Sequence, residues 1–117
     1  MKLLITGCLG HIGSFLIKNL NKIKKIKKIY LLDNNSNNKF IVLAFIKKNN
    51  KSIKFFLEDV LDDKSLNKIP KVDIVIHLAS TTDAQASVGN EKKYILNNLG
   101  SFKNIVKFCI KKKAKLI

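Results

Sequence analysis

The chain has 117 residues, a length suited to a single domain with a modest core. Its 46% hydrophobic and 26% charged residues are typical of a folded globular protein and argue against a disordered one. No apolar run approaches the roughly 18 residues that span a bilayer, so we expect no membrane partner. The N-terminal "MKLLITG" runs straight into glycines without a cleavage site, which argues against a signal peptide.

The net charge of +15 raises the hypothesis of a nucleic-acid-binding protein. All 23 basic residues are lysine, however, although arginine is the preferred side chain for phosphates and guanine edges. Lysine, isoleucine and asparagine, with 23, 16 and 13 copies, all have A/T-rich codons. A compositional bias of the genome therefore explains the charge, and we expect no nucleic-acid partner.

The two cysteines, Cys8 and Cys109, are far apart and belong to no metal-binding pattern. Reduced thiols in a cytoplasmic protein are the natural interpretation, and we expect no metal site.

Strands and helices are predicted to alternate along the chain. Short apolar runs predict strands, and apolar residues at helical spacing predict helices. A polar loop at 80–90 precedes the longest helix. The predicted strands are 1–6, 28–33, 52–57, 72–78 and the first residues of a fifth at 114–117; the predicted helices are 11–20, 39–48, 63–68 and 91–112.

This alternation predicts one α/β domain over residues 1–117, with a Rossmann-like, doubly wound parallel sheet that reaches about the start of its fifth strand.

The stretch "TGCLGHIG" places three glycines between the first strand and the first helix. Gly7 would allow a tight turn, Gly10 would let the backbone approach a pyrophosphate, and Gly13 would permit close helix packing. The amides of the first helical turn, at His11 and Ile12, would then bind phosphate charge. The alternative is that these glycines only make turns.

Asp33 lies twenty residues beyond Gly13, at the end of the second strand. A carboxylate there can accept both hydroxyls of a ribose and would repel a 2′-phosphate, which predicts NAD rather than NADP. The alternative role for Asp33 is to cap a turn in an asparagine-rich loop.

Five stretches resemble the extended short-chain dehydrogenases/reductases, and specifically the NAD-dependent epimerase/dehydratase group that acts on nucleotide sugars. They occur in the family's order along the whole chain. They are "TGCLGHIG", "LLDNNSN", "LEDVLD", "HLAS" followed by "TTDAQASV", and "NNLGSFKNIVKFC".

The resemblance implies positions that contact the cofactor. Asn34 follows the acidic residue, and Asp59 with Val60 would hold the adenine. Leu78, Ala79 and Ser80 would line the ribose and nicotinamide side.

Asn97 would orient the cofactor or hold a structural water, although Asn98 beside it is an alternative because this segment is one residue shorter than usual. The stretch 81–87 would border the sugar nucleotide, and His77 is interpreted as structural.

The family's catalytic residues have no counterpart here, so we assign no catalytic residue. The family uses a Tyr-x-x-x-Lys pair, but the residues four positions after Tyr30 and Tyr94 are Asn34 and Asn98. Family members are also more than twice as long. We therefore expect an N-terminal piece of an enzyme that is inactive alone. The intact enzyme would bind a nucleotide sugar and, like many family members, could be a homodimer.

The alternative hypothesis is a non-catalytic dinucleotide-binding sensor or regulatory module that is complete at this length.

Overall fold

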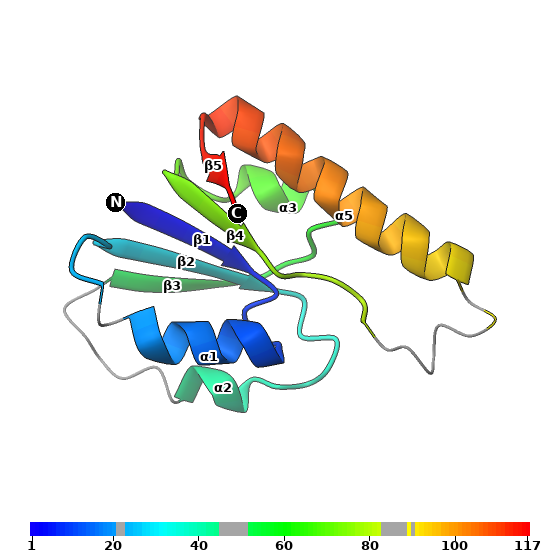
Figure 1. Cartoon of the computed structure of the whole chain (residues 1–117), viewed down its shortest axis with the longest axis horizontal. Coiled ribbons are helices and arrows are strands. Elements are labelled where there is room, and N and C mark those ends of the chain that lie inside the picture. Colours follow the sequence, from blue (N-terminus) through cyan, green and yellow to red (C-terminus); the bar gives the residue numbers. More distant parts are fainter. Residues whose placement is uncertain (21–22, 45–51, 83–88, 90) are drawn as a thin grey trace.

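The computed structural model shows an open parallel sheet with helices on both faces (Figure 1). It describes residues 1–20, 23–44, 52–82, 89 and 91–117. The strands are β1 (Lys2–Thr6), β2 (Lys28–Asp33), β3 (Ser52–Leu57), β4 (Ile74–His77) and β5 (Lys115–Leu116); the helices are α1 (His11–Asn19), α2 (Ile41–Ala44), α3 (Asp63–Asn67) and α5 (Glu91–Lys112).

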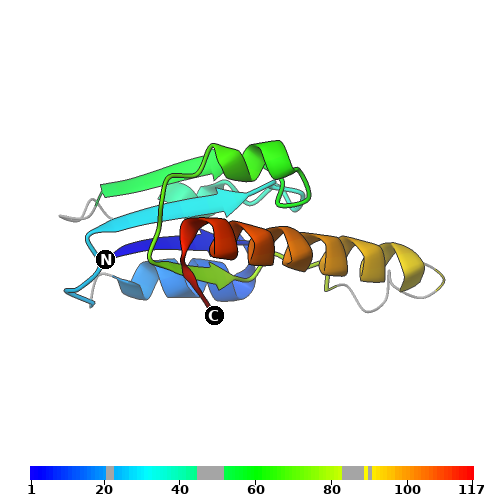
Figure 2. The same cartoon turned by 90° about the horizontal axis from the view of Figure 1, so that it is seen from above.

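The strand order is β3-β2-β1-β4-β5, and all four pairings are parallel. Figures 1 and 2 show α1 and α2 on one face of the sheet and α3 and α5 on the other. This arrangement confirms the predicted Rossmann-like, doubly wound α/β fold. The chain adds β2 and β3 on one side of β1 and then β4 and β5 on the other, so its direction of winding reverses next to β1.

The central strand β1 is buried on both faces, which explains its uninterrupted apolar sequence. Leu3 and Ile5 pack on the α1 side, against Ile17 and Leu20 among others. Leu4 lies on the opposite side, in a core completed by α3 and α5. The core residues in α3, in the segment after it and in α5 include Leu66, Ile69, Val72, Ile105, Phe108 and Cys109.

Most element boundaries agree with the sequence prediction, and two strands and one helix are shorter. The predicted helix 39–48 is observed only as α2, and residues 45–48 lie outside the described part of the chain. Of the predicted strand 72–78, only β4 (Ile74–His77) is observed as a strand. Its pairing with β1 ends at the Thr6–His77 pair, because β1 stops at Thr6 and the chain then turns away. The predicted strand 114–117 is observed over Lys115–Leu116.

Helix α5 extends beyond the sheet at its N-terminal end (Figure 2). The residues buried along it are Ser101, Ile105, Phe108 and Cys109, whereas Ile95, Leu96, Leu99, Phe102 and Ile110 are exposed. Within the described residues, no helix is both long and apolar enough to cross a membrane.

Gly13 sets the distance between α1 and the loop that precedes it. A Cβ at this buried position would lie 2.5 Å from the Gly7 carbonyl oxygen and 2.7 Å from Cys8 Cα. Both are backbone atoms that cannot rotate away, so a larger residue would displace the helix.

We therefore expect Gly13→Ala to lower the free energy of unfolding by roughly 2 kcal/mol or more, measured by urea denaturation. Gly100→Ala is the matched control, since among the described residues its Cβ would meet only the end of the Leu61 side chain, at 3.0 Å. Leu61 is 43% exposed and can turn aside, so the control should match or exceed wild-type stability. Equal stability of Gly13→Ala and the wild type would contradict this packing role.

Candidate functional site

A cleft opens at the carboxyl ends of the strands, where the winding of the sheet reverses. Open α/β sheets bind ligands at this position. The walls come from the loops after β1, β2, β3 and β4 and from α5. The lining residues are Gly7, Leu9, Gly10, Asp33, Asn34, Asn35, Ser36, Asn37, Lys39, Asp59, Val60, Leu61, Leu78, Ala79, Ser80, Thr81, Asn97 and Ser101.

The floor of the cleft depends on Gly7, which has a left-handed backbone with φ of 66°. A Cβ on Gly7 would lie 2.5 Å from both the Ala79 amide nitrogen and the Leu78 carbonyl carbon. The Gly7 N–H donates to the Leu32 carbonyl at 2.9 Å. Only glycine combines this conformation with so close an approach of two backbones.

Gly10 directly precedes α1; its backbone is extended, and it provides no side chain to cap the helix. The first turn of α1 also holds no acidic residue. A Cβ at Gly10 would have only the Gly7 carbonyl oxygen, at 3.3 Å, as a neighbour within 4 Å in the described part of the chain. The N–H groups and positive dipole end of the first turn are thus available to an anion in the cleft.

Asp33, at the end of β2, ties two loops together through its carboxylate. Its Oδ2 accepts the Leu9 N–H at 2.9 Å, and its Oδ1 accepts the Asn35 N–H at 2.8 Å. Each carboxylate oxygen has two lone-pair directions, so both oxygens retain capacity for a further donor in the cleft.

Cys8 lies beside Asp33 but is fully buried in the core on the α1 face. Burial, and secondarily the negative charge of Asp33, raises the pKa of the Cys8 thiol far above its usual value. The sulfur therefore stays protonated and acts as an apolar core group rather than as a nucleophile.

The wall after β3 is held by side chains of the asparagine-rich loop and of the Asp59 turn. The Asn34 amide donates to Asp59 Oδ2 at 3.2 Å, and Asp59 Oδ1 accepts the Leu61 N–H at 2.8 Å. From α5, the Asn104 amide donates to the carbonyls of Val60 and Leu61 at 3.1 and 3.0 Å. These bonds fix the backbone that forms this side of the cleft.

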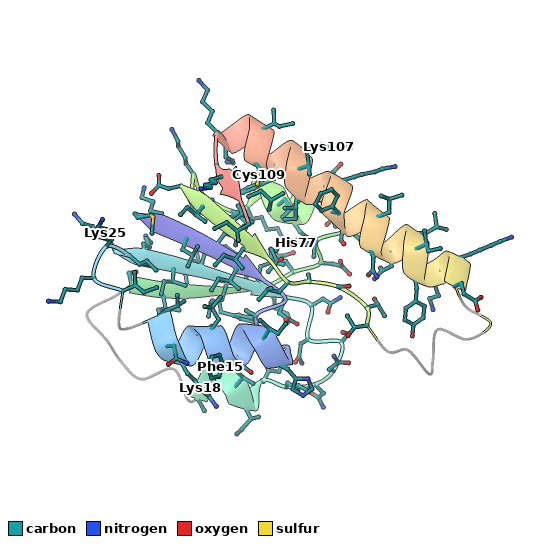
Figure 3. The ribbon with its side chains drawn as sticks, viewed as in Figure 1. Phe15, Lys18, Lys25, His77, Lys107 and Cys109 are labelled. Atoms are coloured by element: carbon teal, nitrogen blue, oxygen red, sulfur yellow. The ribbon has the colours of Figure 1, made fainter. Side chains whose placement is uncertain are left out.

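The wall after β4 is joined to β1 through Thr6 and His77, which are paired across the two strand ends. His77 is labelled in Figure 3, at the end of β4. Thr6 Oγ1 lies 2.7 Å from His77 Nδ1 and accepts the Ala79 N–H at 3.4 Å. The Thr6 hydroxyl donates to Nδ1 when this nitrogen is unprotonated and accepts from it when it carries the proton. Burial lowers the pKa of His77, which favours the neutral imidazole.

The predicted site residues fall into two groups. Ten of them line the cleft together: Gly7, Gly10, Asp33, Asn34, Asp59, Val60, Leu78, Ala79, Ser80 and Asn97. His11, Ile12 and Gly13 do not line it. The side chains of His11 and Ile12 are exposed on α1, and Gly13 packs against the glycine loop. Any contact from this turn would come from its backbone.

Some cleft residues were missed by the sequence prediction. Asn35, Ser36, Asn37 and Lys39 follow Asp33 in the same polar loop, which was a usable signal. Leu9, Leu61 and Ser101 lie inside the quoted stretches "TGCLGHIG", "LEDVLD" and "NNLGSFKNIVKFC", which were also a usable signal. Within the predicted sugar-nucleotide border, Thr81 lines the cleft, whereas 83–87 lie outside the described residues. Among the described residues, no group of three His, Cys, Asp or Glu side chains is arranged to hold a metal ion.

The sequence and the fold both match known proteins. The profile of a family described as "Polysaccharide biosynthesis protein" matches residues 3–117. A dTDP-D-glucose 4,6-dehydratase of Dictyostelium discoideum is 36% identical, over 97% of this chain and 27% of the relative. A UDP-glucose 4-epimerase of Yersinia enterocolitica is 33% identical, over 100% of this chain and 36% of the relative. The chain thus spans about a third of the length of these relatives.

Solved structures agree with the sequence matches. The UDP-Glc/GlcNAc 4-epimerase of Campylobacter jejuni superposes with a TM-score of 0.84 and 28% identity, covering 96% of this chain and 34% of that one. A dTDP-glucose 4,6-dehydratase of Streptomyces venezuelae, crystallised with NAD and TYD bound, reaches 0.86 at 20% identity, over 97% of this chain and 37% of that one. The second likeness concerns the fold alone.

The half-buried His77 should make stability depend on pH. Since its pKa is lowered in the folded state, the unfolded chain binds more protons, and stability must fall as pH drops from about 6.5 through the lowered value. We expect His77→Gln to flatten this part of the profile, measured as unfolding free energy between pH 5 and 8. His11→Gln, at the exposed histidine of α1, is the matched control variant. A His77→Gln profile that is as steep as the wild type would contradict the assignment.

Proposed function

Because the chain belongs to the polysaccharide biosynthesis protein family, and with it to the NAD-dependent epimerases and dehydratases, we propose that it forms the NAD-binding portion of a nucleotide-sugar epimerase or dehydratase. The observation that carries the proposal is that Asp33 and the Gly7–Gly10 loop line one cleft, where the Leu9 N–H donates to the Asp33 carboxylate.

The glycine loop fits the pyrophosphate of the dinucleotide. Gly10 lines the cleft without a side chain, and the uncapped N-terminus of α1 directly follows this residue. The first-turn amides would donate to phosphate oxygens, and the positive helix end would favour their charge. In this role His11 and Ile12 contribute backbone N–H groups only, and Gly13 allows α1 to approach.

Asp33 fits the adenosine ribose. The Leu9 and Asn35 amides hold both carboxylate oxygens in fixed positions, so the group is oriented before a ligand arrives. It would accept the 2′- and 3′-hydroxyls and would repel a 2′-phosphate. Asn34, Asp59 and Val60 would then border the adenine on the neighbouring wall.

The wall from Leu78 to Ser80, with Asn97 of α5 opposite, would contact the second ribose and the nicotinamide. When bound, NAD supplies a hydride acceptor for sugar oxidation. The residues of this chain would bind and orient that cofactor. The nucleotide-sugar substrate, and a homodimeric assembly, are proposed for the longer enzyme, because the chain spans only about a third of its relatives.

The two cysteines are both free and buried, which fits the proposed cytoplasmic location.

The cofactor proposal predicts a preference between two dinucleotides. We expect calorimetric titration of the chain to give tighter binding of NAD than of NADP. Asp33→Asn should weaken NAD binding by roughly 10- to 100-fold, because charge-assisted hydrogen bonds are lost. The same change should reduce the preference for NAD over NADP. Asp63→Asn, on α3 and outside the cleft, is the control. Tighter binding of NADP by the wild type would contradict the role of Asp33.

The same proposal predicts that the 117-residue chain turns over no nucleotide sugar, because neither tyrosine begins a Tyr-x-x-x-Lys pair. We expect no interconversion of UDP-glucose and UDP-galactose and no dehydration of dTDP-glucose when the purified chain is assayed with NAD. Turnover that copurifies with the folded chain through successive columns would contradict this statement.

A further inference from the structure

Thr81, at the end of the cleft wall after β4, is held by two adjacent asparagines of α5. The Asn98 side chain makes two bonds to its backbone: Oδ1 accepts the Thr81 N–H at 2.8 Å, and Nδ2 donates to the Thr81 carbonyl at 3.1 Å. The Asn97 amide donates to Thr81 Oγ1 at 2.5 Å. A single residue is thus fixed by three hydrogen bonds.

The two asparagines have different positions relative to the cleft. Asn97 lines the cleft together with Thr81, whereas Asn98 is not among the lining residues. Asn98 instead bonds the Thr81 main chain with both its amide oxygen and its amide nitrogen, in the way that a neighbouring strand would. Its backbone carbonyl also accepts the Ser101 hydroxyl at 2.9 Å, which ties the same turn of α5 to a buried residue that reaches the cleft.

Among the described residues, the 78–81 wall is held at its β-sheet end by Thr6 and at its other end by Asn97 and Asn98 of α5. Leu78 N–H donates to the Thr6 carbonyl and Ala79 N–H to Thr6 Oγ1. Beyond Ser80 the described chain runs away from the sheet, and the Asn98 bonds anchor it to α5 instead. The wall therefore spans between Thr6 at the sheet and α5, where Asn98 holds the Thr81 backbone and Asn97 holds its side chain.

We propose that Asn98 is a positioning residue for the cofactor: by fixing the Thr81 backbone it sets the distance between the 78–81 wall and Asn97 and so preorganises the nicotinamide side of the cleft. The inference rests on the proposed function. It also separates the two asparagines, since Asn97 borders the ligand space and Asn98 acts through Thr81.

The test compares Asn98→Leu with a matched substitution outside the cleft. Asn19→Leu is suitable, because Asn19 is also a helical asparagine that donates to one backbone carbonyl, that of Phe15 at 2.9 Å. Both variants are titrated with NAD by calorimetry at a temperature where circular dichroism shows them fully folded. We expect Asn98→Leu to bind about tenfold more weakly than the wild type and Asn19→Leu to bind as the wild type does.

Hydrogen exchange at the Thr81 amide is the local readout. Asn98→Leu should lose protection at Thr81 but keep it at Leu78, whose bond is to Thr6. Asn98→Asp adds a pH signature, since an ionised carboxylate can accept the Thr81 N–H but cannot donate to its carbonyl. Its NAD affinity relative to the wild type should therefore improve as pH is lowered toward the aspartic acid pKa, ordinarily about 3.9.

NAD affinity and hydrogen exchange at Thr81 together distinguish a positioning role of Asn98 from a purely structural one. Loss of Thr81 protection with unchanged NAD affinity would overturn the positioning role. Asn98 would then only link α5 to the Thr81 backbone, without affecting the cofactor. Unchanged protection at Thr81 would overturn the inference at its first step. Absence of NAD binding by the folded wild type would instead overturn the proposed function, and the role of Asn98 with it.

Discussion

The structure depends on a contact between two backbones at Gly7. The chain leaves β1 there in a left-handed conformation and passes so close to Leu78 and Ala79 that a Cβ would overlap both. Since Thr6 is registered with Leu32 on one side and His77 on the other, this contact fixes three strand ends at once. The direction in which α1 starts, and the cleft between the two halves of the sheet, both follow from it.

A second constraint is the use of one carboxylate for two purposes. Asp33 accepts backbone amides from the loops after β1 and β2, which stabilises the shape of the cleft before any ligand binds. The same oxygens face the position proposed for a ribose. The capping role and the ribose role that the sequence left as alternatives are therefore compatible. Asp33 also helps to keep its neighbour Cys8 in the neutral thiol form.

The sequence was sufficient for the fold because its signals are local. Buried parallel strands appear as short apolar runs, and the glycine spacing marks the turn between β1 and α1. The sequence could not supply contacts that depend on register, such as the pairing of Thr6 with His77 across 71 positions. The sequence also could not distinguish the roles of Asn97 and Asn98. The two residues are adjacent in the sequence, but Asn97 lines the cleft and Asn98 does not. His11 and Ile12 were chosen by motif position, which specifies their backbone and not their side chains.

The central claim is that the cleft between the glycine loop, Asp33 and the wall after β4 receives NAD. The most direct measurement is an NMR titration of the isotope-labelled chain with NAD, following the backbone amides. We expect the largest shift changes at Gly7, Leu9, Gly10, Asn35 and Ala79, with little change along the outer face of α5 that bears the exposed lysines Lys103 and Lys107. Changes concentrated on that lysine-bearing face, or none at the glycine loop of the folded chain, would contradict it.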